Sequence, residues 1–153
     1  MMAFLFPRPA AILIAALPLC FSESAFAEPE AGEVIPLWAD GAPGFEDRKD
    51  EPEVVEGHSV TNIHYPTLTA FRPPNDKANG VAIVIAPGGG LRKLGVKGGG
   101  IEPARFLASH GYTTFVLKYR LSRQPGVPYK FEEHLLQDGQ RAVRMVRQLA
   151  KDV

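Results

Sequence analysis

The stretch Val81–Leu91, "VAIVIAPGGGL", decides the fold. Its first part, Val81–Ala86, is a run of apolar, mostly β-branched residues, and it ends at Pro87 and three consecutive glycines. Such a run is typical of a strand that is buried on both faces of a sheet, as in parallel sheets that are covered by helices. The glycines follow directly after the strand, where open α/β sheets bind their ligands. The question is what three residues without side chains do at that place.

The segments that follow predict the fold class. Ile101–His110 has apolar residues at helical spacing and ends at Gly111, and Tyr112–Tyr119 predicts a second strand that is apolar on both faces. Glu132–Lys151 predicts a long amphipathic helix. Strands that alternate with helices indicate an α/β fold with a parallel-type sheet flanked by helices. The apolar stripe of the long helix consists of Leu135, Leu136, Ala142, Val143, Val146 and Leu149.

The residues before Val81 predict a less regular region. Val60–Tyr65 and Leu68–Phe71 predict two short strands that form an N-terminal β-hairpin or meander. Residues 28–58 are rich in Glu, Asp, Pro and Gly and predict an irregular arm. We expect Ile35, Leu37 and Trp38 to dock this arm onto the domain. The predicted organisation is a leader at 1–27, an arm at 28–58 and a domain at 59–153.

The first 27 residues predict a secretory signal peptide. One basic residue, Arg8, precedes the apolar stretch Ala10–Phe21, and small residues end at Ala27 in an A-x-A cleavage pattern. A membrane anchor is the alternative, but the apolar stretch is short for a bilayer core of about 30 Å. We therefore expect an exported protein, periplasmic or secreted, with no membrane association after cleavage. Cleavage removes Cys20, the single cysteine, and with it any disulfide or thiol nucleophile.

Composition and spacing restrict the partners. The chain has 17 basic and 17 acidic residues, so its charge does not indicate a nucleic-acid partner. No two histidines have the spacing of a zinc site such as H-E-x-x-H. We expect no metal and no cofactor.

Three interpretations of the glycine stretch compete. A dinucleotide loop of the form G-x-G-x-x-G requires glycine where this chain has Lys93, and a Walker loop requires lysine where it has Val96. A plain turn is the second interpretation. The third is an oxyanion hole, in which backbone N–H groups stabilise the negative oxygen of a tetrahedral intermediate in acyl transfer.

Three motifs in order resemble one known fold. They are "IAPGGG" after a strand, "LKYRL" at Leu117–Leu121 and "LQDGQRAVRMVR" at Leu136–Arg147. The combination resembles the α/β-hydrolase fold, in particular the secreted carboxylesterases near the hormone-sensitive-lipase group, which include acetyl-xylan and feruloyl esterases. The resemblance implies a small-molecule or polysaccharide ester as substrate. It also implies oxyanion donors at Gly89 and Gly90, substrate contacts at Gly88 and Leu91, and scaffold roles for Tyr119, Arg120, Asp138 and Arg141.

The serine nucleophile of this fold is not found at its expected place. It lies in G-x-S-x-G on the strand that follows the long helix, whereas this sequence ends at Val153. The sequence "GHSVT" at 57–61 lacks the last glycine and precedes the glycine stretch, so we do not expect an elbow there. We expect the N-terminal part of a serine-dependent esterase, inactive by itself. The alternative is a non-catalytic truncated product or pseudo-enzyme that acts at most as a binding module.

Two further expectations concern the histidines and the sheet edge. His58, His64, His110 and His134 are the possible bases, and we expect His64 and His110 at the surface or at a helix cap. If the strand that carries the serine is missing, Val81–Ala86 becomes an apolar sheet edge without charges. Such an edge favours self-association.

Overall fold

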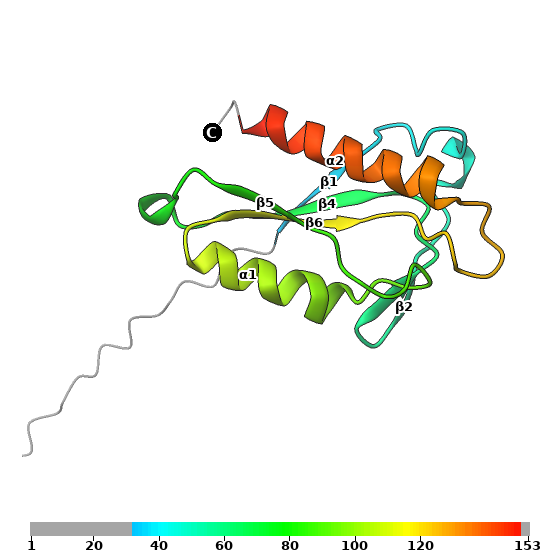
Figure 1. Ribbon diagram of the computed structural model, residues 1–153, viewed down its shortest axis with the longest axis horizontal. Helices are drawn as coiled ribbons and strands as arrows, with labels where there is room; N and C mark the ends of the chain where they lie inside the picture. The colour runs from blue at the N-terminus through cyan, green and yellow to red at the C-terminus, as the bar shows by residue number, and fades with distance from the viewer. Residues whose placement is uncertain (1–31, 151–153) are drawn as a thin grey trace, which may run out of the picture.

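The computed structural model describes residues 32–150 of the chain. The predicted signal peptide at 1–27 and residues 151–153 lie outside the described residues. The described chain forms three layers, in which a four-stranded sheet lies between α1 (Glu102–Ser109) and α2 (Leu136–Leu149), as Figure 1 shows. The predicted α/β class is confirmed.

The four-stranded sheet is mostly antiparallel. β4 pairs antiparallel with β1 on one side and with β6 on the other, whereas β5 pairs parallel with β6. The predicted parallel arrangement therefore holds for one pair only. The physical reason is that a parallel pair needs a crossover connection, and α1 provides one between β5 and β6. The strand order is β1 (Glu33–Pro36), β4 (Thr67–Phe71), β6 (Thr113–Lys118) and β5 (Ala82–Ile85).

The N-terminal hairpin is present, but it uses other strands than predicted. β2 (Val54–Glu56) pairs with β3 (Ser59–Thr61) in a separate two-stranded sheet, through a turn at Gly57 with φ +57°. The predicted pairing of Val60–Tyr65 with Leu68–Phe71 is wrong. β1 and β6 occupy both edges of β4, so no edge of β4 is left for the preceding segment.

The arm at 28–58 is not wholly irregular, which corrects the prediction. It contributes β1 to the main sheet, a 3₁₀ turn at Glu46–Arg48, and β2. The predicted docking is confirmed, because Leu37 is completely buried in the core and Ile35 and Trp38 pack against the same cluster. A Pro- and acid-rich composition concealed β1, because its pairing partners lie more than thirty residues further along the chain.

The sheet buries one core cluster on each face. Along β6, Phe115 and Leu117 pack with Ala142 and Val146 of α2, whereas Val116 packs with α1 on the opposite face. Burial of each large apolar side chain stabilises the fold by about 1.5–3 kcal/mol. The helical segment on the α1 side begins earlier than predicted, with a π-helical turn at Lys97–Ile101.

The apolar stripe of the long helix divides into two parts. A π-helical turn at Phe131–Leu135 precedes α2, and Leu135, Ala142 and Val146 are buried as predicted. Leu136 and Val143, by contrast, are 48% and 42% exposed. Both line an apolar groove together with Ala86, the residue that follows β5. The predicted core face of the helix is therefore wider than the face that is buried.

Candidate active site

The glycine stretch forms a tight loop at the carboxyl end of β5. Gly89 and Gly90 have φ angles of +152° and +66°, and Leu91 has φ +62°, which is unusual for a residue with a side chain. A Cβ atom at Gly89 would collide with the backbone carbonyl of Lys93. Only glycine at 89 is therefore compatible with this loop. Leu91 in the left-handed region stores backbone strain of order 1 kcal/mol or more.

Hydrogen bonds to its carbonyl groups hold the loop in place. The Tyr119 hydroxyl donates to the Pro87 carbonyl at 2.8 Å. The N–H of Gly95 donates to the Gly88 carbonyl at 2.8 Å, and the N–H of Arg123 donates to the Leu91 carbonyl at 2.9 Å. Burial raises the pKa of Tyr119, so its hydroxyl stays protonated and remains a donor. The predicted scaffold role of Tyr119 is confirmed.

The N–H groups of the same loop are free. Within residues 32–150, no acceptor contacts the backbone N–H of Gly89, Gly90 or Leu91. Gly89 and Gly90 are exposed. Donors that are exposed in this way are open to water or to a ligand. The predicted roles of Gly89 and Gly90 as oxyanion donors, and of Gly88 and Leu91 as substrate contacts, stay predictions.

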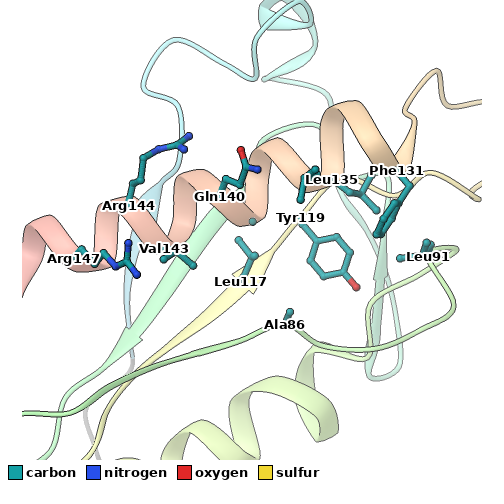
Figure 2. A pocket seen from close by; sticks show the side chains of 12 residues that line it. Ala86, Leu91, Leu117, Tyr119, Phe131, Leu135, Gln140, Val143, Arg144 and Arg147 are labelled. Atoms are coloured by element: carbon teal, nitrogen blue, oxygen red, sulfur yellow. The ribbon is translucent and has the colours of Figure 1, made fainter.

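An apolar groove of about 590 Å³ begins at the loop and runs between α2 and the end of β5. Figure 2 shows the Leu91 side chain at one end of it, beside Tyr119 and Phe131, with Arg147 at the other end. Leu117 and Val143 line its middle. Leu91 therefore lies beside an apolar surface, whereas Gly88 is not among the lining residues.

The described residues contain no serine nucleophile paired with a base. "GHSVT" is the turn and second strand of the β2–β3 hairpin, not a strand-to-helix elbow, as expected. Ser109 lies 3.2 Å from His110 Nδ1, but that nitrogen is 2.8 Å from the Phe106 carbonyl. Because a carbonyl only accepts, Nδ1 carries the proton and does not act as a base for Ser109. His110 follows the last residue of α1, at the helix cap that we expected.

His64 is completely buried, which corrects the expected surface position. The Asn62 amide nitrogen donates to the Pro52 carbonyl at 2.7 Å, so the Asn62 Oδ1 faces His64 Nε2 at 2.7 Å. Nε2 therefore carries the hydrogen, and Nδ1 accepts from the Tyr129 hydroxyl at 2.6 Å. Both ring nitrogens are satisfied, which makes burial possible. The sequence shows no signal for this, because Tyr129 is 65 residues away.

Desolvation lowers the pKa of His64, and the Arg48 guanidinium lowers it further, while the Glu51 carboxylate acts in the opposite direction. Both side chains approach Nε2, Arg48 at 3.1 Å and Glu51 at 3.3 Å. The ring is therefore held neutral at the centre of a cluster that joins the arm to the loop before α2. It is a structural group rather than a free base.

The scaffold roles predicted for Arg120, Asp138 and Arg141 are confirmed. Arg120 and Asp138 are both completely buried, and their closest contact is 2.7 Å. Asp138 also accepts from the Arg120 backbone N–H and from Trp38 Nε1. Arg141 donates to the Leu37 carbonyl at 3.0 Å. These contacts connect α2 to the end of β6 and to the arm.

A second glycine stretch, Gly98–Gly100, supports the loop and was not singled out from the sequence. A Cβ atom at Gly100 would lie 2.7 Å from Val116 Cγ1 and 2.9 Å from Pro87 Cγ. Glycine at 100 thus allows the helical segment to approach the sheet and the start of the loop. A glycine run directly before a helix that crosses between parallel strands is the signal that could have predicted it.

Residues 32–150 contain neither a candidate metal-binding cluster nor a candidate membrane-spanning helix. No group of three or more His, Cys, Asp or Glu side chains is placed to hold a metal ion. None of the helices in this range has the length and apolarity to cross a membrane.

Comparison with known proteins places the fold among esterases. No protein-family model matches the sequence, and no curated protein matches it. An acetyl ester-xyloside bifunctional hydrolase from Caldicellulosiruptor lactoaceticus superposes with a TM-score of 0.56 and 29% identity, over 80% of this chain and 38% of that one. Esterase 2 from Thermogutta terrifontis has a TM-score of 0.50 and 19% identity, over 79% and 37%. The chain thus has a carboxylic ester hydrolase-like fold and spans less than two fifths of these neighbours.

Proposed function

We propose that this domain supplies the oxyanion hole of a serine-dependent carboxylic ester hydrolase, with Gly89 and Gly90 as backbone donors. The observation that carries the proposal is the set of free N–H groups in a constrained loop at the carboxyl end of β5. The esterase-like fold supports it. One neighbour is named as an acetyl ester-xyloside hydrolase, which favours a short-chain or carbohydrate-linked ester as substrate.

The chemistry follows from where negative charge develops. When a nucleophile adds to an ester carbonyl, the carbonyl π electrons move to the oxygen, which becomes an oxyanion. Pre-positioned N–H donors stabilise that oxygen by about 3–4 kcal/mol per donor. We propose that nucleophile, base and acid come from residues other than 32–150, and that the 153-residue chain alone does not hydrolyse esters.

The first test measures 4-nitrophenyl acetate hydrolysis by the chain alone. We expect a rate equal to that of a Ser59→Ala variant, because Ser59 lies in a hairpin strand and not in an elbow. Hydrolysis that Ser59→Ala abolishes would overturn the proposed inactivity and place a nucleophile at "GHSVT".

The second test addresses the donors directly, in a chimera in which residues 32–150 replace the matching part of the Caldicellulosiruptor hydrolase. The chimera should hydrolyse the acetyl ester. Gly89→Ala should lower its kcat by about 10²–10³ with little change in KM, because the displaced N–H groups act only in the transition state. Gly98→Ala is the matched control, since a Cβ there would meet only Glu102 Oε2, at 3.8 Å, which is an ordinary contact distance. A folded chimera with equal kcat for both variants would remove the loop from catalysis.

A non-catalytic binding module is the second candidate. It is favoured by the lack of a serine–base pair among residues 32–150 and by the groove beside Leu91. The chimera separates the two, because a folded but inactive chimera supports the binding module and contradicts the esterase proposal.

A further inference from the structure

His64 connects three segments that are far apart in the sequence. Its completely buried ring contacts the arm, the residue after β3 and the loop before α2. Nδ1 accepts from the Tyr129 hydroxyl at 2.6 Å, and Nε2 faces the Asn62 Oδ1 at 2.7 Å. On the Nε2 side, the Arg48 and Glu51 side chains approach from the arm, at 3.1 Å and 3.3 Å. A change of charge on this ring therefore acts on all three segments.

The segment that carries Tyr129 also holds the glycine loop. We call residues 121–130 the connecting segment, because it runs from the end of the buried pair after β6 to the start of the helical turn before α2. The N–H of Arg123, near its beginning, donates to the Leu91 carbonyl at 2.9 Å. Tyr129, near its end, donates to His64. The connecting segment thus joins the His64 ring to the glycine loop.

A second proton on the His64 ring changes the hydrogen-bond pattern around it. In the neutral ring, Nε2 carries the hydrogen and Nδ1 accepts from Tyr129. When Nδ1 also takes up a proton from solvent, the Tyr129 oxygen has to accept, and its own hydrogen needs a new acceptor. Tyr129 is 3% exposed, and within residues 32–150 its hydroxyl has no other hydrogen-bond partner. A buried donor without a partner costs free energy, which favours displacement of the tyrosine.

The charges around the ring determine when this proton is taken up. Desolvation lowers the pKa of His64, the Arg48 guanidinium lowers it further, and the Glu51 carboxylate opposes both. The ring is therefore half protonated only below pH 6.5. Burial raises the pKa of Tyr129, so its hydroxyl keeps its hydrogen over the same range. The titratable and charged groups that face the ring or its tyrosine partner are Arg48, Glu51, Tyr129, Arg120, His134 and Asp138.

We propose that His64 is an acid-sensitive switch for the glycine loop. Proton uptake at Nδ1 displaces Tyr129, the connecting segment moves with it, and its bond to the Leu91 carbonyl shifts. The N–H groups of Gly89 and Gly90 directly precede that carbonyl in the chain, so their direction changes as well. The consequence that acid lowers ester hydrolysis rests on the proposed function, whereas the movement of the loop does not.

Nuclear magnetic resonance of the full chain tests the switch, with the pH lowered from roughly 7.5 to 5. We expect the amide signals of Gly89, Gly90 and Leu91 to move with the same midpoint as the His64 ring signals, because one proton drives both. His64→Gln should abolish this displacement, since glutamine does not titrate. His58→Gln, in the exposed hairpin turn, is the matched control and should keep it.

A second variant keeps the proposal testable if glutamine at 64 disturbs folding. Tyr129→Phe keeps the aromatic ring but removes the hydroxyl that His64 binds. The His64 ring should still titrate, while the displacement of the glycine-loop signals should fall at least about twofold. Tyr65→Phe, which removes a hydroxyl that binds the Ala39 carbonyl, is the matched control and should leave the displacement unchanged.

Several outcomes would overturn the switch. They are glycine-loop signals that stay in place while His64 titrates, a displacement that persists in His64→Gln or at full size in Tyr129→Phe, and unfolding of the chain before the ring takes up its proton. The readout is the loop itself, so a failure of the switch differs from a failure of the proposed function. A loop that responds to pH, together with an unchanged kcat for Gly89→Ala in the chimera, would keep the switch and remove the catalytic role.

Discussion

Two neighbouring regions at the same end of the sheet, one after β6 and one after β5, differ in how many of their hydrogen-bond donors have a partner. After β6, the Arg120 guanidinium donates from Nε and Nη2 to the Asp138 carboxylate. Nη2 also donates to the Gln137 side chain and to the His134 carbonyl, and only Nη1 lacks a partner. After β5, the loop binds through its carbonyl groups, while the N–H groups of Gly89 and Gly90 stay free and exposed. The first region stabilises the fold, and the second leaves exposed donors, for which we propose a role in ligand binding. The comparison predicts that substitutions in the two regions lower the free energy of unfolding by different amounts.

The largest expected effect is at the buried pair. Asp138→Ala leaves the completely buried Arg120 guanidinium without its counter-charge, so we expect a loss of about 3–5 kcal/mol in the free energy of unfolding. Denaturant titration measures it. Glu133→Ala breaks an exposed pair with Lys130 and should leave the free energy of unfolding nearly unchanged. Equal effects of the two variants would show that the buried pair is not structural.

A smaller effect is expected in the glycine loop. Gly89→Ala must move the loop away from the Lys93 carbonyl and adopt an unfavourable φ, so we expect a loss of about 1–3 kcal/mol. Gly88→Ala meets no neighbouring atom and should be close to neutral. Thermal unfolding of both variants checks the difference. If Gly89→Ala is as stable as the parent chain, the left-handed loop is not required by the fold.

The smallest expected effect is a pH dependence at His64. Its pKa in the folded state is lowered from 6.5, so the unfolded chain binds more protons near that pH. The contribution of neutral His64 to the free energy of unfolding is present above about pH 6.5 and is lost as the pH falls below that value. Unfolding measured from roughly pH 7.5 to 5.5 should show the loss, with an uptake below about one proton.

His64→Gln removes the titrating group, so its stability should vary less over this pH range. His58→Gln, in the exposed hairpin turn, should keep the dependence of the parent chain. A dependence that persists in His64→Gln would assign it to another group.

Local sequence patterns predicted where the strands and helices lie better than they predicted which strands pair with one another. Val81–Ala86, Tyr112–Tyr119 and Glu132–Lys151 were recognised because an apolar run or a helical period is a property of adjacent residues. β1 was missed because a short acidic and proline-containing strand has no such pattern, and β4 was assigned to the wrong hairpin. The glycine loop was placed correctly. Its orientation, however, depends on hydrogen bonds that Tyr119, Gly95 and Arg123 donate to its carbonyl groups. Tyr119 and Arg123 are close to the loop in space but distant from it in the sequence.

The sequence by itself determined the fold class, the position of the glycine loop and the need for glycine at a turn after a buried strand. Each depends on backbone preference and on the alternation of apolar residues, which act within a few residues. The tertiary structure alone decided that β4 pairs with β1, that His64 is buried, and that Leu136 and Val143 lie at an open groove instead of in the core. These outcomes depend on which distant segment covers a side chain, and burial is a property of the whole packed chain.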